Sequence, residues 1–315
     1  MRLSLGLVGW GRGVIQYFPG HMQRARRQIG EALQRVDVVI EILDARMPQG
    51  SSNPLLDELC ANKPRLRLLN KADLADPQVT QAWCRVLRGA TGGNTAVMAV
   101  NALRPADLRR IPSSCRRLAA QRTQRGGGIT AMVVGIPNIG KSTVLNTLAG
   151  RRVARVGNEP GVTRAQQLIH QGSGLRMLDT PGVLWPKFAD QDAACRLAIL
   201  GALRETAFAV GEVACFALDF LRRRYPEGLT QRFGVVPDEA NSSQWLVHIG
   251  RRRGCLRAGG EVDVEQAAAL LLRELRGGAL GKVSLEFPTR DAAWVTEENP
   301  QVEEGASGSA IDGVP

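Results

Sequence analysis

The chain has 315 residues and a formal net charge of +11, with 41 basic and 30 acidic side chains. This length leaves room for one domain of ordinary size and a smaller second domain. No run approaches 18 consecutive apolar residues, which argues against a transmembrane helix and a membrane partner. The six cysteines lack metal-ligand spacing and suit reduced thiols better than a disulfide framework.

Basic charge is concentrated ahead of the C-terminal end. The last 25 residues contain six acids and no base, so the preceding part carries +17 (41 − 24). Only five of the 41 basic residues are lysine, and guanidinium groups bind phosphate bidentately and stack on bases. The charge therefore favours structured RNA as a partner, with an arginine-rich solvated surface as the alternative.

The N-terminal extension, residues 1–16, contains two arginines and no acid, but it lacks the long apolar core of a signal sequence. An ordinary bacterial start and a cytoplasmic location are expected, with an organellar transit segment left open. A helix is expected within residues 17–35, followed by a strand at residues 36–43. The helix carries three candidate RNA ligands, Arg24, Arg26 and Arg27.

A guanine-specificity element, N-K-A-D at residues 70–73, follows an expected strand at residues 64–69. The Asp73 carboxylate can accept from N1–H and N2–H₂ of guanine, and adenine presents neither donor in that arrangement. Asn70 is expected to tie the base pocket to the phosphate loop, and the Lys71 stem is expected to cover the base. Alone, N-K-x-D is a common polar turn, so its weight depends on the other motifs.

The next segment contains a strand and a basic connector. The strand, at residues 95–100, ends in Asn101 and Ala102, which are candidates to give a backbone N–H to guanine O6. Residues 104–125 contain seven arginines and lead into a triple-glycine hinge. This connector is expected to be solvated and flexible, with RNA contact as the alternative.

A complete phosphate-binding loop, G-x-x-x-x-G-K-S, occupies residues 135–142 between an expected strand at residues 130–134 and an expected helix. Its glycines let backbone N–H groups turn inward on the phosphates, and the helix N-terminus adds partial positive charge. Lys141 is expected to reach the β- and γ-phosphates as a catalytic group, and Ser142 to ligate Mg²⁺. The other expected GTP ligands of this loop are Asn138, Ile139, Gly140 and Thr143.

Two later segments complete the expected site. A strand at residues 175–178 runs into D-T-P-G, in which Asp179 is expected to hold Mg²⁺ directly or through water. The Gly182 N–H is expected to sense the γ-phosphate during catalysis. Between the phosphate loop and D-T-P-G, Thr163 offers a hydroxyl that would close over Mg²⁺ in the GTP state, with an ordinary loop threonine as the alternative.

The order of these motifs is the reverse of that in an ordinary GTPase, because N-K-x-D lies 65 residues (135 − 70) ahead of the phosphate loop. The sequence thus predicts guanine as the base and a circularly permuted P-loop GTPase domain over residues 17–190. The expected class is α/β, a mostly parallel sheet with helices on both faces, followed by a small all-α domain. Helical patterns dominate residues 191–287, whereas the acidic tail at residues 288–315 lacks a core pattern and is expected to be disordered.

Taken together, these motifs resemble the YlqF/RbgA family of ribosome-assembly GTPases. The likeness covers about residues 15–287 and includes F-P-G-H-M at residues 18–22, D-A-R-M-P at residues 44–48 and R-G-C-L at residues 253–256. Two departures are notable. Arg164 stands where a second small hydroxyl residue is expected, and Asn101-Ala102 is a loose version of the usual S-A-K.

The resemblance implies a GTP-hydrolysing assembly factor that acts in late maturation of the large ribosomal subunit. Val183 stands where many GTPases have a water-orienting glutamine, so hydrolysis by the free protein is expected to be slow. The resemblance makes His21 the candidate that positions water on the ribosome, with a packing or capping histidine as the alternative. Asn138 matches a position that supplies an oxygen to K⁺ in related GTPases, with loop stabilisation as the alternative.

The resemblance also implies that the helical part is an RNA-binding module similar to ANTAR domains. Its candidate RNA ligands are Arg251, Arg252, Arg253 and Arg257. The expected partners are GTP or GDP and the large ribosomal subunit with its rRNA, and the expected oligomeric state is a monomer. A GTPase that regulates tRNA or protein targeting is the competing class, in which the basic surface would serve another partner.

Overall fold

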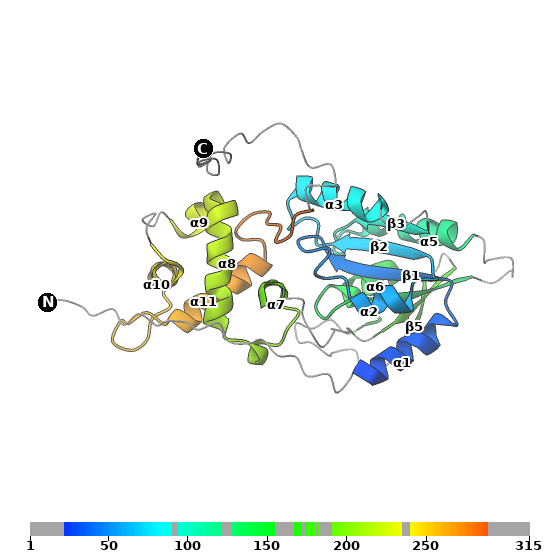
Figure 1. Cartoon of the computed structure of the whole chain (residues 1–315), viewed down its shortest axis with the longest axis horizontal. Helices are drawn as coiled ribbons and strands as arrows, with labels where there is room; N and C mark the ends of the chain where they lie inside the picture. The colour runs from blue at the N-terminus through cyan, green and yellow to red at the C-terminus, as the bar shows by residue number, and fades with distance from the viewer. Residues whose placement is uncertain are drawn as a thin grey trace, which may run out of the picture.

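The computed structural model describes residues 22–89, 94–120, 128–154, 167–171, 174–180, 182, 191–234 and 240–288. A β-sheet flanked by helices lies beside a separate group of helices (Figure 1). The strands are β1 (Val38–Asp44), β2 (Arg65–Asn70), β3 (Thr95–Ala99), β4 (Ile129–Val134), β5 (Gln167–Gln171) and β6 (Leu175–Asp179).

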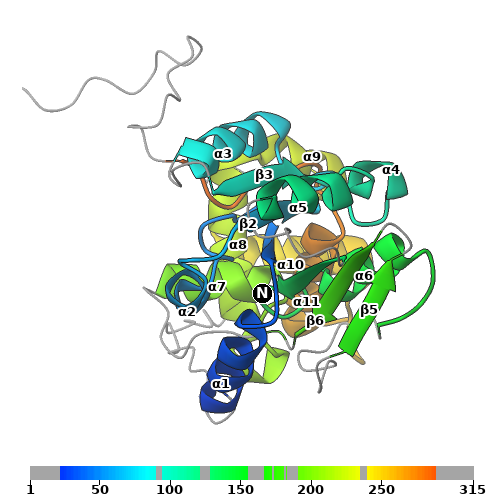
Figure 2. The ribbon, with the colours of Figure 1, turned by 90° about the vertical axis from the view of Figure 1, so that its right-hand side faces the viewer.

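The six strands form one sheet in the order β3-β2-β1-β4-β6-β5, and every neighbouring pair is parallel except β5 and β6. All seven residues of β1 are buried, as expected for a central strand covered on both faces. In Figure 2, β5 lies at one edge of the sheet and β3 lies at the other.

Helices cover both faces of this sheet. Alternate residues of β1 point to opposite faces: Val39 packs with helices α1 and α2, whereas Ile40 packs with α5 and α6. On the first face, the loop between β2 and β3 adds α3, whose Trp83 packs against Leu69. The helices on the two faces are α1 (Met22–Leu33), α2 (Pro54–Leu59), α3 (Pro77–Gly89), α5 (Ile111–Ala119) and α6 (Lys141–Ala149). The predicted α/β class with a mostly parallel sheet is confirmed.

The basic connector is ordered over much of its length, contrary to the expected flexible loop. It forms α4 (Pro105–Leu108) and α5, and Ile111 and Cys115 are fully buried against the sheet. The physical reason is that apolar residues spaced for one helix face alternate with its arginines. Residues 121–127, which include the rest of the connector and most of the hinge, lie outside the described residues, as does the tail beyond residue 288.

The helices described after the sheet are α7 (Gln191–Ile199), the short 3-10 helix η1 (Glu205–Ala207), α8 (Val210–Arg224), α9 (Pro226–Phe233), α10 (Ser242–Arg253) and α11 (Val264–Arg276). Apolar patterns in the sequence predict helices at residues 193–203, 212–224, 244–252 and 265–276, which correspond to α7, α8, α10 and α11, whereas α9 and η1 are not predicted. Asn241 begins α10 with a reciprocal capping box to Gln244. Asp263 begins α11 by accepting from the Gln266 N–H.

The chain after α11 returns to the sheet and joins the two parts of the molecule (Figure 1). Backbone N–H groups of Val283 and Leu285 donate to Leu74 and Arg46 carbonyls, at 2.9 and 2.7 Å. The half-buried Glu286 carboxylate accepts from the Gly50 N–H at 2.9 Å. The helical part is therefore anchored on the loops that follow β1 and β2. Among the helices that the structure describes, none has the length and apolar character needed to cross a bilayer.

Candidate nucleotide site

The phosphate loop runs from the C-terminal end of β4 into the N-terminus of α6. Gly135 and Gly140 have positive φ angles of 152° and 102°, a backbone region open chiefly to glycine. A Cβ on Gly140 would lie 2.3 Å from the side-chain nitrogen of Asn70, and one on Gly135 would lie 2.6 Å from the Ile42 carbonyl oxygen. Both glycines are therefore required by close contacts from neighbouring strands.

Lys141 lies buried at the start of α6, where its Nζ donates to the carbonyl oxygens of Gly135 and Ile136 at 3.0 and 2.8 Å. Burial lowers the pKa of this ammonium to about 8, although nearby Asp179 opposes the shift. The Lys141 ammonium is thus hydrogen-bonded to the backbone of the phosphate loop itself. Phosphate oxygens of a bound nucleotide could replace these carbonyl oxygens as its acceptors.

Asp179 ends β6 next to the phosphate loop, with β4 as the neighbouring strand. Burial raises its pKa to about 6, although Lys141 lowers it in part. Its Oδ1 is buried and has no hydrogen-bond partner among the residues that the structure describes. A buried carboxylate oxygen without a partner suits Mg²⁺, which prefers oxygen ligands, and the hydroxyl of Ser142 in the first turn of α6 is the second expected ligand.

Gly182 approaches the phosphate loop closely. A Cβ on this residue would lie 2.9 Å from both the Lys141 Nζ and the Pro137 nitrogen, so any larger residue would push the two loops apart. Before it, Thr180 is anchored, because its hydroxyl donates to the Val133 carbonyl at 2.7 Å. The Gly182 backbone therefore lies beside the Lys141 ammonium, and its contact with a γ-phosphate remains a prediction.

Asn70 joins three loops at the C-terminal ends of the strands. Its Nδ2 donates to the Ile139 carbonyl of the phosphate loop at 2.8 Å, and its Oδ1 accepts from the Ala102 N–H at 3.0 Å. The Asn101 N–H donates to Asp107 at 2.9 Å. Because both N–H groups already have protein acceptors, the contact from Asn101 or Ala102 to guanine O6 remains a prediction.

Lys71 and Asp73 differ in how strongly the protein holds them. Lys71 has a positive φ of 59°, and its Nζ donates to the Asn138 carbonyl at 3.0 Å. Burial lowers the pKa of Lys71, whereas the ion pair with Asp44 at 3.2 Å raises it. Asp73 is exposed, and no hydrogen bond or ion pair to it is found within the described parts of the chain. Its carboxylate is thus open to a base lying over the Lys71 stem.

One charged pair of this region was not predicted as part of the site. Asp44, fully buried at the end of β1, accepts two hydrogen bonds from the Arg46 guanidinium, each at 2.9 Å. Burial alone would raise the pKa of Asp44, but Arg46 and Lys71 outweigh it and hold the pKa well below its usual range. The sequence signal was an acid at the end of an apolar strand, two residues ahead of an arginine.

This pair also connects the site with the helical part. The Arg46 Nη1 donates to the Arg276 carbonyl at 3.3 Å, and the Arg276 side chain donates to the carbonyls of Ala198 and Ile199, each at 2.8 Å. From the phosphate loop, the Asn138 Nδ2 donates to the Gly201 carbonyl at 2.8 Å. The loops that would hold base and phosphates therefore both touch the helical part.

The structure leaves some predicted site residues undescribed. His21, Thr163, Arg164 and Val183 all lie outside the described residues. Of the expected phosphate-loop ligands, Ile139 is buried, whereas Ser142 and Thr143 are half-buried in the first turn of α6. The site that can be described therefore brings together the base element, the phosphate loop, Asp179 and Gly182.

The predicted RNA ligands fall into two separate groups. On α1, Arg26 pairs with Glu58 at 2.9 Å and Arg27 with Glu31 at 3.3 Å, while the Arg24 side chain is not described. At the end of α10, Arg251 and Arg252 are exposed. Two neighbours are engaged in the fold, since Arg253 pairs with Glu274 at 2.6 Å and Arg257 with Asp263 at 3.1 Å.

Comparison with known proteins gives consistent results. Residues 130–231 match the family described as 50S ribosome-binding GTPase. The chain is 44% identical over 282 residues to "Ribosome biogenesis GTPase A" of Bacillus cereus, covering 87% of this chain and 94% of that protein. It is 32% identical to mouse "Mitochondrial ribosome-associated GTPase 1", with coverage of 88% and 91%. A crystal structure of GNP-bound YlqF from Thermotoga maritima aligns at a TM-score of 0.60 and 27% identity, covering 84% of this chain and 99% of that one.

Proposed function

This chain belongs to the YlqF/RbgA family of ribosome biogenesis GTPases, and we infer that it hydrolyses GTP as an assembly factor for the large ribosomal subunit. The observation that carries this proposal is the junction at Asn70. One side chain contacts the phosphate loop and the loop after β3, which supports the proposal that the motifs form one guanine nucleotide site despite their reversed order.

GTP is proposed to bind across the C-terminal ends of the strands. Backbone N–H groups of the phosphate loop, including those of Asn138, Ile139 and Gly140, would face the phosphates, and Lys141 would leave its carbonyl acceptors for phosphate oxygens. Asp73 would accept from guanine. Ser142, Thr163 and Asp179 would hold Mg²⁺, which neutralises charge on the phosphates. Thr143 would add a hydroxyl beside the phosphates.

Hydrolysis in the free protein is proposed to be slow. Val183 cannot orient water in the way that glutamine does, and Gly182 supplies only its backbone. His21 would provide the missing group once the N-terminal segment is bound to the particle. An imidazole can orient or accept a proton from water near neutral pH.

A K⁺ ion at Asn138 is a further proposal about this site. A monovalent cation between the phosphates would offset charge that develops during hydrolysis. Asn138 lies on the phosphate loop with a positive φ of 57°, and its Nδ2 donates to Gly201, so the amide is already held at the loop. Its Oδ1 would be the atom that faces the ion.

The RNA-binding surface is proposed to combine two parts. Arg24, Arg26 and Arg27 on α1 would contact rRNA from the GTPase domain at residues 17–190. Arg251 and Arg252 would do so from the helical domain at residues 191–287, with Arg253 and Arg257 shaping that end of α10 through their ion pairs. We expect a monomer that acts in the bacterial cytoplasm during late subunit maturation.

Co-sedimentation with ribosomal subunits tests this function. With a non-hydrolysable GTP analogue, the full chain should travel with large subunits in a sucrose gradient, and with GDP it should remain near the top. A Lys141→Ala variant should behave as the GDP form under all conditions. Sedimentation that is independent of nucleotide, or association with tRNA in place of large subunits, would contradict the proposal.

A further inference from the structure

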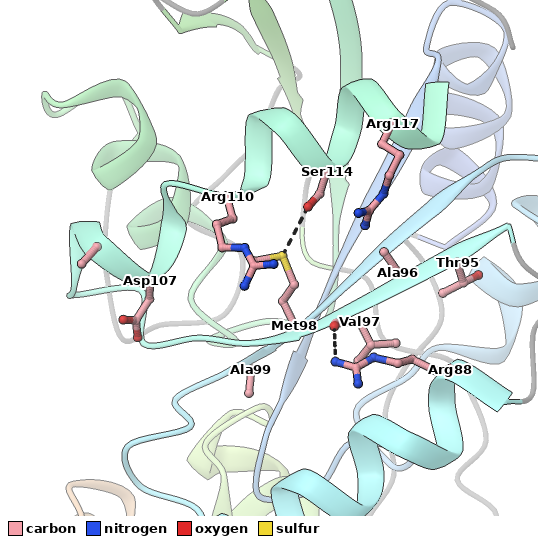
Figure 3. Close-up of a pocket in the computed structure, with 11 residues that line it drawn as sticks. Arg88, Thr95, Ala96, Val97, Met98, Ala99, Asp107, Arg110, Ser114 and Arg117 are labelled. Carbon is pink, nitrogen blue, oxygen red and sulfur yellow. Dashed lines mark hydrogen bonds between the residues drawn. The ribbon is translucent and has the colours of Figure 1, made fainter. Parts of the chain in front are cut away.

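A solvent-open cavity of about 650 Å³ lies along the outer edge of the sheet, beyond the residues of the nucleotide site (Figure 3). Its floor is β3, whose one strand neighbour within the described parts of the chain is β2. On one side stands α3, and on the other stand α4 and α5, so two helical layers continue past the edge strand. We call this cavity the edge groove and define it by Arg88, Val97, Met98, Arg110 and Arg117.

Three arginines enter the edge groove from opposite sides. Arg88 comes from the end of α3, Arg110 stands at the start of α5, and Arg117 lies near the end of that helix. Figure 3 shows their guanidinium groups directed over β3, with Arg110 beside Met98 and Arg88 beside Val97. All three residues are exposed, and among the described residues none of them forms an ion pair with an acid.

The surroundings of the groove are strongly basic. Residues 77–120 contain seven arginines, at 85, 88, 104, 109, 110, 116 and 117, and one acid, Asp107. Asp107 lines the groove, but its carboxylate accepts from the Asn101 N–H at 2.9 Å. The elements around β3 therefore present an excess of fixed positive charge to solvent.

The exposed strand edge is itself partly covered. The Arg88 Nη2 donates to the Val97 carbonyl at 3.0 Å, which uses an acceptor that an added peptide strand would need. The remaining floor is formed by short or unbranched side chains, including Ala96 and Met98, and the Ser114 hydroxyl contacts the Met98 sulfur at 3.8 Å. A floor of small and unbranched side chains bordered by guanidinium groups leaves room for sugars and bases that follow a row of phosphates.

We propose that the edge groove binds the phosphodiester backbone of an RNA strand. The arginines come from α3 on one side of β3 and from both ends of α5 on the other, so an extended polyanion fits better than a single small anion. Guanidinium groups bind phosphate bidentately, whereas a peptide adding to the edge would have to displace Arg88. This proposal rests on the proposed function in one respect, which is that rRNA is the source of the bound strand.

The test measures RNA binding by the full chain. A fluorescent single-stranded RNA of about 12 nucleotides would be titrated by anisotropy at several salt concentrations. An Arg110→Gln/Arg117→Gln variant should bind about tenfold more weakly than the parent. Each lost phosphate contact lowers the slope of log affinity against log salt by about 0.7, so the slope should fall by about 1.4. Leaving Arg88 unchanged keeps the strand edge covered.

A matched control distinguishes the loss of the groove arginines from a general loss of positive charge. Arg151→Gln/Arg152→Gln removes two exposed charges just after α6 and should retain the affinity and salt slope of the parent. Binding of a fluorescent GTP analogue should be equal in all three proteins. If the groove variant fails to bind GTP, the proposal is tested on the parent protein by cross-linking to RNA that contains 4-thiouridine. The cross-links should fall on peptides within residues 85–117.

Several results would overturn the proposal. These are an unchanged RNA affinity and salt slope in the groove variant, an equal loss in the control variant, or cross-links that avoid residues 85–117. Displacement of the RNA by a polyglutamate peptide at equal charge concentration would assign the groove to acidic peptides. None of these results bears on nucleotide-dependent sedimentation with large subunits, so failure of the groove and failure of the proposed function remain distinguishable.

Discussion

At the scale of single residues, the candidate site places charged groups where only a bound nucleotide and metal would fully satisfy them. The Lys141 ammonium rests on carbonyl oxygens and the Asp179 Oδ1 lacks a hydrogen-bond partner within the described chain. Burial shifts the pKa of each toward neutrality, to about 8 and about 6. Because burial disfavours both charges, phosphate and Mg²⁺ would each restore the ionised form of one residue.

We expect Lys141→Ala to reduce GTP affinity by at least about a hundredfold, because truncating one partner of a buried charged contact costs about 2–5 kcal/mol. Binding of a fluorescent GTP analogue would measure the loss. Lys282→Ala removes an exposed lysine and should bind as the parent does. Retained GTP hydrolysis by Lys141→Ala would remove the phosphate loop from the active site.

Asp73→Asn should weaken GTP and GDP to a similar extent, because a carboxylate facing two guanine donors becomes an amide that also presents donors. Asp73 is exposed, so the melting temperature should stay within about 2 °C of the parent value. Calorimetric titration with both nucleotides, followed by a thermal melt, gives the two readings. Unchanged affinity would place the base elsewhere.

Hydrolysis should be faster in K⁺ than in Na⁺ at matched ionic strength if Asn138 supplies an oxygen to the ion. Phosphate release would be measured in both salts for the parent and for Asn138→Ala. The variant should lose the difference between the salts, beyond any general loss caused by removing its contact with Gly201. Equal rates for the parent in the two salts would leave Asn138 with a purely structural role.

At the scale of elements, the loops after β1 and β2 do two tasks. They carry Arg46 and Lys71 beside the buried Asp44, and they receive the chain that returns after α11. The motif D-A-R-M-P therefore has a physical role in this chain. Its acid and its arginine form an internal pair, and the arginine backbone and side chain hold the helical part.

Arg46→Met should destabilise the protein by about 3 kcal/mol at pH 7, because it leaves Asp44 buried with Lys71 as its remaining cation. In the parent, the depressed pKa of Asp44 contributes stability above the unfolded pKa of about 3.9, and this is lost as pH falls toward the folded pKa. The difference between parent and variant should therefore shrink below about pH 4.

Denaturant unfolding at pH 7 and at pH 3 would test both parts of this prediction. Arg223→Met is the matched control, since Arg223 is exposed on α8 and should change stability little at either pH. If Arg46→Met lowers the free energy of unfolding by the same amount at pH 7 and at pH 3, the loss does not come from an unpaired charge on Asp44.

At the scale of the whole molecule, the helical part contacts both ends of the nucleotide site. It reaches the base side through Leu74 and Arg46 and the phosphate side through Asn138. The direct covalent connection between the two parts runs from Asp179 to Gln191, and residues 181 and 183–190 of it lie outside the described residues. A change in either loop on nucleotide exchange could therefore bias the orientation of the helical part, which is a two-state shift driven by the ligand.

His21→Ala should bind GTP and large subunits as the parent does, yet lose most of the subunit-stimulated hydrolysis. A group supplied on binding can raise such a rate by orders of magnitude, as an arginine finger does. Phosphate release with and without large subunits would measure the effect, and His170→Ala on the exposed edge strand β5 is the control. Full stimulation of His21→Ala would assign water positioning to the ribosome.

Much of this protein could be predicted from contiguous residues. Five of the six strands, the phosphate loop and most helices depend on local apolar patterns, glycines and capping residues. The missed elements include the helices α2 and α3 between the strands, as well as β5 and α9. β5 is a short edge strand with an exposed Leu168, and α9 lacks a side-chain cap. The ordered connector was misjudged because arginines on its outer face obscured a buried inner face.

The sequence by itself determined the chemistry at each motif, because backbone geometry and charge within four to eight residues decide how a loop can meet a phosphate or a base. Only the tertiary structure decided which motifs meet. Asn70 reaches Ile139 across 69 positions, and Arg46 reaches Arg276 across 230. Such contacts depend on strand order and on how the C-terminal chain packs, and no local pattern encodes either one.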